Sequence, residues 1–207
     1  MVYLVGWSLF FIFFKIYLSF KIVGRKNVPK TGAFIFASNH SSYLDPILLG
    51  VALYRGLYYI AREDLFAKPL PDWIMRGVHA FPLKRNSGDL GALRQALAIL
   101  KEGKPLVIFP EGTRATDKNL RPAKPGVGFI AAKSGVPVVP VYIDGSFEAF
   151  PKGIKTLRRQ HVTVYIGEPV AIDPDVGHNS KKAYQDISDE IMKSIASLKD
   201  KHVGKTG

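Results

Sequence analysis

The chain is 207 residues long, which is the size of one ordinary domain. Hydrophobic residues make up 47% and charged residues 22%, so the chain can bury a sizeable core and is not disordered throughout. Lys and Arg number 29 against 17 Asp and Glu, and the formal charge of +12 favours an anionic partner: nucleic acid, anionic lipid or a phosphorylated substrate. The absence of cysteine excludes disulfides, thiolate zinc sites and cysteine nucleophiles.

The N-terminal segment is the most biased part of the chain. Val2–Phe14 is almost wholly apolar and rich in aromatic residues, and Lys15 and Lys21 follow it. We predict a helix embedded in one face of a bilayer, with residues 1–22 as the membrane anchor and 23–207 as one domain at the cytoplasmic face. A spanning helix and a buried core helix are the alternatives. A cleaved signal peptide does not fit, because no basic residue precedes the apolar run and no small-x-small site follows it.

The remaining sequence alternates strand-like and helix-like runs. The predicted strands are Ala33–Ser38, Leu57–Ala61, Leu106–Phe109, Val136–Ile143 and Val162–Ile166. The predicted helices are Pro46–Tyr54, a leucine-patterned run over 90–100, Gly126–Lys133 and the tail from Ser180. This alternation predicts an α/β fold with a mixed, mainly parallel sheet covered by helices. Because Pro137 and Pro140 lie within one of the predicted strands, we expect part of that strand to be an edge or irregular.

His40 and Asp45 follow the first predicted strand within the run NHSSYLDP. Five residues apart on a continuous helix, their side chains would point about 140° away from each other, so they meet only if a strand-to-helix turn folds between them. Such a turn would lie at the carboxyl end of a strand, where open α/β sheets bind ligands. A carboxylate on one imidazole nitrogen makes the other nitrogen a general base. The spacing alone also fits a polar turn with a solvated histidine.

The candidates for substrate binding all follow a strand-like run and can contact a phosphate or a hydroxyl. They are Arg62, Arg85, Glu111, Gly112, Thr113 and Arg114. Gly112 permits close backbone approach, Thr113 offers a hydroxyl, and Arg114 offers a planar fork that matches phosphate. Glu111 could hold that fork or a substrate hydroxyl. The competing interpretation is a polar turn in which Glu111 and Arg114 pair with each other, with the other arginines as solvated surface charge.

Four ordered blocks, NHSSYLDP, FPLKR, FPEGTR and VPVVPVYI, resemble the sequence blocks of the glycerolipid acyltransferases, and the 1-acylglycerol-3-phosphate acyltransferases are the most similar branch. The likeness runs from about Gly24 to Ile143 and marks 23–207 as an acyltransferase domain. Many relatives have an acidic residue where this chain has Lys84, and some have two N-terminal apolar helices where this chain has one.

The resemblance implies transfer of an acyl group from acyl-CoA or acyl carrier protein to the sn-2 hydroxyl of lysophosphatidate, forming phosphatidate. It implies that His40 is the base and Asp45 its orienting partner, and that Arg85 and Arg114 bind the acceptor phosphate. Glu111 and Gly112 would belong to the acceptor-side loop, and Arg62 lies where relatives often carry a basic residue. A thioester is already activated, so we expect no metal and no cofactor, and the sequence contains no His-Glu-x-x-His pattern.

Two rival functions remain at this point. An acyltransferase acting on another lysolipid, such as a lyso-aminolipid, would depend less on the arginines. A basic, non-enzymatic membrane-binding or nucleic-acid-binding protein would use the cluster Lys152, Lys155, Arg158 and Arg159. No nucleic-acid-binding module is visible in the sequence, so we predict a lipid bilayer rather than nucleic acid as the partner.

Overall fold

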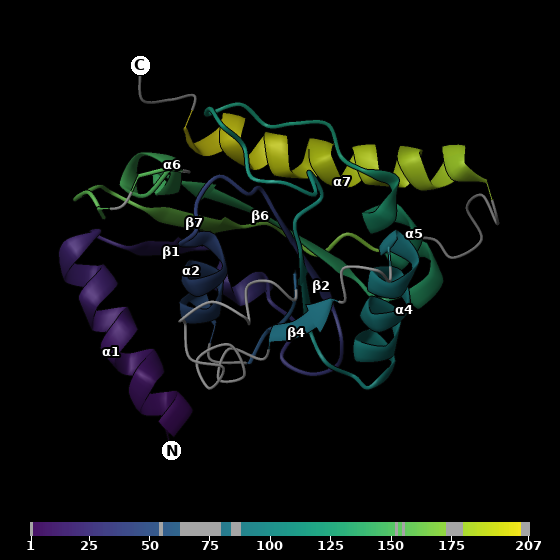
Figure 1. Ribbon diagram of the computed structural model, residues 1–207, viewed down its shortest axis with the longest axis horizontal. Coiled ribbons are helices and arrows are strands. Elements are labelled where there is room, and N and C mark those ends of the chain that lie inside the picture. The colour runs from purple at the N-terminus through teal and green to yellow at the C-terminus, as the bar shows by residue number, and fades with distance from the viewer. Residues whose placement is uncertain are drawn as a thin grey trace.

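A mixed, mainly parallel sheet forms the centre of the molecule, as the sequence predicts. The computed structural model describes residues 2–53, 56–62, 80–83, 88–151, 153–154, 156–172 and 180–203. The strands of this part are β1 (Lys21–Val23), β2 (Ile35–Ser38), β3 (Tyr58–Arg62), β4 (Ala80–Leu83), β5 (Leu106–Ile108), β6 (Val138–Asp144) and β7 (Thr163–Ile166). Their order in the sheet is β1-β7-β6-β2-β5-β3-β4, and only the β6–β7 pair is antiparallel (Figure 1).

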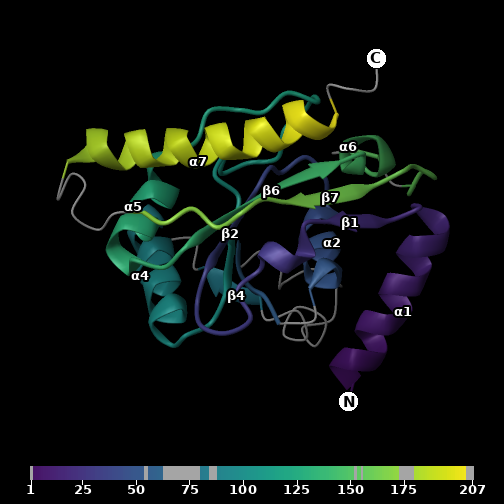
Figure 2. The same ribbon diagram turned by 180° about the vertical axis from the view of Figure 1, so that it is seen from behind.

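Helices cover both faces of this sheet. They are α1 (Val2–Tyr17), α2 (Asp45–Ala52), α4 (Gly88–Lys101), α5 (Pro125–Ser134), α6 (Ser146–Ala149) and α7 (Lys181–His202), with a 3₁₀ turn at Arg25–Asn27. Strand β2 is buried on both faces because successive side chains point to opposite sides. Phe36 packs with α1 and α2, whereas Ile35 and Ala37 pack with α4, α5 and α7. Figures 1 and 2 place α1 and α4 at opposite ends of the molecule.

Each predicted strand and helix is present, with boundaries shifted by a few residues. The tail helix α7 buries Ile187, Ile191 and Ile195 as its periodicity predicts, and the Ser180 hydroxyl accepts a hydrogen bond from Ala183 N–H at its start. Strand β1 was not predicted, because its first two residues, Lys21 and Ile22, lie in the segment assigned to the anchor. It pairs with β7, near the other end of the chain.

For the strand with Pro137 and Pro140, the predicted edge is wrong, whereas the alternative of an irregular stretch describes its β7 side, where an isolated Val138–Val170 bridge precedes the regular ladder. Strand β6 contains Pro140 and lies inside the sheet, between β2 and β7. The paired residues of β6 and β7 start at Val141. Just before them, the carbonyl oxygen of Pro140 accepts a hydrogen bond from Gly167 N–H. The missing proline N–H therefore falls beyond the end of that ladder, where it breaks no registered pair.

Helix α1 divides its residues between the core and the outside. Phe14 is buried together with Leu18 and Phe20, so the end of the helix and the residues after it belong to the core. The domain boundary predicted after residue 22 falls inside β1, in a segment continuous with that core. On the other side of the helix, Phe10, Ile12, Phe13 and Ile16 are 46–70% exposed. Within the described residues, none of the helices is both long enough and apolar enough to cross a membrane.

Candidate active site

The strand-to-helix turn after β2 is held by its neighbours before any substrate is considered. The buried side chain of Asn39 bridges to β6: its Nδ2 donates to Ile143 O at 3.0 Å and its Oδ1 accepts from Ile143 N at 2.7 Å. From the loop after β5, Ala115 N donates to His40 O at 2.7 Å. Because β2, β5 and β6 are parallel, their carboxyl ends meet at this edge of the sheet, which brings the two loops together.

His40 and Asp45 meet across the turn as predicted. His40 Nδ1 lies 2.9 Å from Asp45 Oδ2, and the aspartate is wholly buried as the first residue of α2. The same oxygen accepts hydrogen bonds from Ser41 N and Ser42 N, each at 2.7 Å. Since a carboxylate can only accept, Nδ1 carries the hydrogen and Nε2 is left with a free lone pair. The His40 ring also stacks on Phe109, with ring centroids 3.9 Å apart. The polar-turn alternative with a solvated histidine therefore does not describe this site.

Glu111 is bonded to backbone rather than to an arginine. Its side chain is only 3% exposed, and its two oxygens accept from His40 N at 2.9 Å and from Arg121 N at 3.2 Å. Burial raises the pKa of Glu111, and the two N–H donors act in the opposite direction. The carboxylate thus joins the His40 turn to the loop that follows β5. Its predicted contact with substrate remains a prediction.

Arg114 stacks on the ring of Tyr43, which belongs to the turn between His40 and Asp45. Its Cζ lies 3.4 Å from the centroid of the Tyr43 ring. Nη1 is buried, and no described residue accepts a hydrogen bond from it. Gly112 and Thr113 are exposed beside it, and Gly112 has a φ of 67°, a left-handed conformation that favours glycine. Four of the predicted binding residues, Glu111 to Arg114, therefore lie on the loop that touches His40.

The other basic candidates are only partly described. Arg62 is the last residue of β3, opposite Leu83 of β4, and its side chain is outside the described part. Arg85 and Lys84 lie outside the described residues, as do Lys152 and Lys155 of the rival basic cluster. Arg158 and Arg159, the other two members of that cluster, are exposed.

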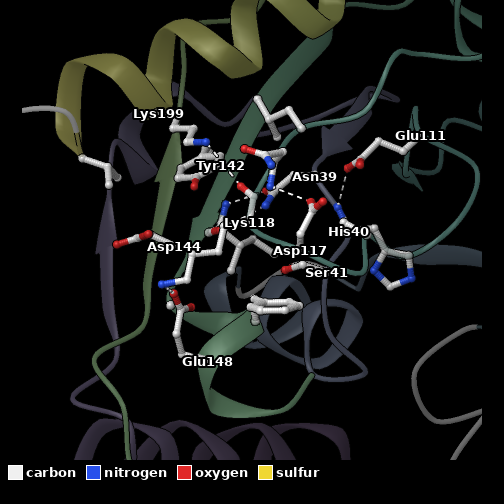
Figure 3. A pocket seen from close by; sticks show the side chains of 17 residues that line it. Asn39, His40, Ser41, Glu111, Asp117, Lys118, Tyr142, Asp144, Glu148 and Lys199 are labelled. Atoms are coloured by element: carbon white, nitrogen blue, oxygen red, sulfur yellow. Dashed lines mark hydrogen bonds and ion pairs between the residues drawn. The ribbon is translucent and has the colours of Figure 1, made fainter. Parts of the chain in front are cut away.

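A pocket of about 220 Å³ lies beside the turn that holds His40 (Figure 3). Its wall contains Asn39, His40 and Ser41, but the His40 ring points away from it. Lys118 pairs with Glu148 at 2.5 Å, and Lys199 Nζ donates to Lys118 O at 3.3 Å.

Burial, together with the negative charge of Glu148, raises the pKa of Asp144, another residue in the wall of this pocket. This cluster was not predicted from the sequence. Its charged residues come from the loop after β5, from strand β6 and from helices α6 and α7, and they form no local motif.

Comparisons with known proteins agree with the resemblance seen in the sequence. A family model described as Acyltransferase matches residues 19–144. A chloroplastic 1-acyl-sn-glycerol-3-phosphate acyltransferase of Brassica napus is 35% identical over 153 residues, which cover 72% of this chain and 44% of that protein. A 1-acyl-sn-glycerol-3-phosphate acyltransferase of Bacillus subtilis is 29% identical over 184 residues, covering 87% of this chain and 88% of that protein.

The fold has a counterpart among solved structures. The crystal structure of the 1-acyl-sn-glycerophosphate acyltransferase of Thermotoga maritima superposes with a TM-score of 0.75 at 31% identity, covering 95% of this chain and 79% of that one. This chain spans less than half the length of two chloroplastic relatives that it matches, those of Brassica napus and Arabidopsis thaliana, at 44% and 43%.

Proposed function

This chain belongs to the acyltransferase family, and we propose that it transfers a fatty acyl group from a thioester donor to the sn-2 hydroxyl of lysophosphatidate, forming phosphatidate. The observation that carries the proposal is the His40 imidazole, held by Asp45 at 2.9 Å with Nε2 free to act as a base. The names of the bacterial and plant relatives support the choice of acceptor. The donor is acyl-CoA or acyl carrier protein.

His40 takes the proton of the acceptor hydroxyl on Nε2 while the hydroxyl oxygen attacks the thioester carbonyl carbon. The tetrahedral intermediate collapses, the carbon–sulfur bond breaks, and the proton passes to the leaving thiolate. Asp45 stabilises the imidazolium that forms between these steps. A positioned base of this kind typically contributes about 10²- to 10⁴-fold in rate. No metal or cofactor is needed, because the thioester supplies the activation.

The two serines of the turn are not suited to act as nucleophiles. Ser41 Oγ is buried and lies 3.1 Å from Ser146 Oγ. Ser42 Oγ, also buried, donates to Phe150 O at 2.7 Å. Since both hydroxyls are engaged away from the free imidazole nitrogen, the acceptor hydroxyl is the nucleophile and the acyl group moves in one transfer.

Arg114 binds the acceptor phosphate, beside the exposed Gly112 and Thr113. Its buried, unpartnered Nη1 supports this role, because a phosphate oxygen would supply the missing acceptor. Arg85 and Arg62 are proposed to complete the cationic site.

A thiol-release assay with acyl-CoA and a panel of lysolipids tests the function. We expect release with lysophosphatidate, weaker release with a lyso-aminolipid or a phosphate-free 1-acylglycerol, and loss of release in His40→Ala. Activity that survives His40→Ala would refute the mechanism. A preference for the lyso-aminolipid would refute the acceptor, and retention on DNA without release of thiol from any acceptor would support the non-enzymatic alternative.

The acceptor and the product are membrane lipids, and we propose that the exposed side of α1 lies in the cytoplasmic face of a bilayer. Its apolar residues are followed by Lys15 and Lys21, which suit anionic headgroups. Deleting the helix would also remove buried Phe14, so the sharper test is a triple change of Phe10, Phe13 and Ile16 to Ser. We expect this variant to lose sedimentation with anionic vesicles. Leu90→Ser, which changes a 67% exposed residue on α4, is the matched control and should sediment normally.

A further inference from the structure

Tyr43 connects the catalytic turn to the loop that follows β5. It lies between His40 and Asp45 in the sequence, and its ring is 49% exposed. The guanidinium carbon of Arg114 lies 3.4 Å from the centre of this ring, which is the separation of a stacked pair. The ring therefore covers one face of the guanidinium and leaves its N–H edge in the plane of the stack.

Both members of this pair are fixed by the hydrogen bonds of the turn. Ser42, the residue before Tyr43, donates from Oγ to Phe150 O at 2.7 Å and accepts from Leu44 N at 3.1 Å. On the other side, Arg114 precedes Ala115, whose N–H bonds to His40 O at 2.7 Å. The stack is thus held by the same backbone that holds the His40 imidazole. A phosphate bound at the guanidinium edge would lie at a fixed place relative to Nε2.

One N–H group of the Arg114 guanidinium, at Nη1, has no acceptor among the described residues. This nitrogen is also buried. A buried N–H without an acceptor is unfavourable, and a charge-assisted bond to phosphate would remove the penalty. Stacking favours this arrangement, because a ring over the face of the guanidinium leaves its in-plane donors available.

We infer that Tyr43 is a positioning residue for acceptor specificity: its ring holds the Arg114 guanidinium edge-on to the phosphate of the lysolipid, at a fixed distance from the catalytic base. The inference rests on the proposed function, in which Arg114 binds that phosphate. Tyr43 takes no part in proton transfer, so its effect lies in acceptor binding rather than in the chemical step.

The test compares Tyr43→Leu and Tyr43→Phe in the thiol-release assay. We expect Tyr43→Leu to raise the KM for lysophosphatidate about 3- to 30-fold, with kcat changed less than about threefold, because the lost interaction is of cation–π size. The KM for 1-acylglycerol, which has no phosphate, should not change. Tyr43→Phe keeps the ring face and should restore the KM. If Tyr43→Phe is as impaired as Tyr43→Leu, or if both acceptors are affected equally, the inference is wrong.

Two further variants separate this inference from the proposed function. If Arg114→Ala leaves the KM for lysophosphatidate unchanged, the proposed phosphate site is wrong. If Arg114→Ala raises that KM and Tyr43→Leu does not, only the positioning role fails. Tyr58→Leu is the matched control, because the Tyr58 ring also lies under a cation, with Lys104 Nζ 5.0 Å from its centroid. Tyr58 is the first residue of β3 and therefore lies at the amino ends of the parallel strands, away from the turn that holds His40. We expect this control variant to keep the wild-type KM. Tyr43→Met repeats the comparison if the leucine variant unfolds.

Discussion

Replacing Asp45 by asparagine separates the charge of the catalytic pair from its geometry. Asp45 Oδ2 accepts all three hydrogen bonds, from His40 Nδ1 at 2.9 Å and from the Ser41 and Ser42 N–H groups at 2.7 Å each. Oδ1 is buried without a hydrogen-bond partner among the described residues. An asparagine carbonyl can therefore take the place of Oδ2 and keep all three donors, with its amide nitrogen in the place of Oδ1. The imidazole keeps its tautomer and loses only its negative neighbour.

In the proposed mechanism the charge matters when His40 holds the acceptor proton, because an imidazolium then faces Asp45. Two unit charges about 4 Å apart attract by about 4 kcal/mol at an effective dielectric constant of about 20. At about 1.36 kcal/mol per tenfold change in rate, the full interaction corresponds to roughly a thousandfold. We expect Asp45→Asn to lower kcat by about 10²- to 10³-fold and to change the free energy of unfolding by no more than about 1 kcal/mol.

Thiol release with lysophosphatidate measures kcat, and denaturant unfolding measures stability. Asp45→Ala is the comparison variant, because it leaves the Ser41 and Ser42 N–H groups buried without an acceptor. Each unsatisfied group costs about 1–3 kcal/mol, so this variant should lose stability as well as activity. The reasoning is refuted if Asp45→Asn keeps kcat within tenfold of the wild type, or if it destabilises the protein as much as Asp45→Ala.

Three further changes test the surroundings of the site and the packing of the fold. Glu111→Gln offers one acceptor oxygen to two backbone N–H groups, so the free energy of unfolding should fall by about 1–3 kcal/mol. We also expect kcat to fall, and an unchanged kcat would contradict a role of Glu111 in holding the His40 turn. The pKa of Asp144 is raised by burial and a nearby carboxylate, so stability declines as pH rises through that pKa. Thermal unfolding should therefore show Asp144→Asn gaining stability over the wild type at pH 7 and losing that advantage in acid. Gly128→Ala puts a Cβ 2.0 Å from the backbone of α7 and should cost about 1–3 kcal/mol or more in denaturant unfolding. Gly126→Ala, whose Cβ would come no nearer than 3.7 Å to another atom, should be tolerated.

Local features of the site could be predicted from the sequence. The His40–Asp45 pair lies within one short turn, so the direction change between a strand and a helix is enough to bring the side chains together. The placement of Arg114 beside that turn also followed, because two parallel strands that end at the same edge bring their loops into contact. The predicted alternation of strands and helices led to the correct fold class because the periodicity of each run can be read from its own residues.

Features that depend on distant partners could not be predicted. Strand β1 has three residues and forms only because β7 offers it a free edge. Pro140 gave a misleading indication, because a proline is tolerated inside a sheet where the neighbouring ladder ends, and the sequence does not show where that is. The stack of Arg114 on Tyr43 joins two loops, and either residue alone looks like ordinary surface composition.

Glu111 combines a local sequence feature, its place after a strand, with contacts to residues that are distant in the sequence. The sequence suggested an arginine or substrate partner for it, whereas its oxygens accept from the backbone of His40 and Arg121. The backbone of His40 is thereby bonded through its N–H to Glu111 and through its carbonyl to Ala115, while Asp45 holds its ring. The base is fixed in place on three sides before a lipid arrives. Little free energy then has to be spent on ordering it in the proposed reaction, and this favours a mechanism in which a single imidazole and a fixed cation support acyl transfer.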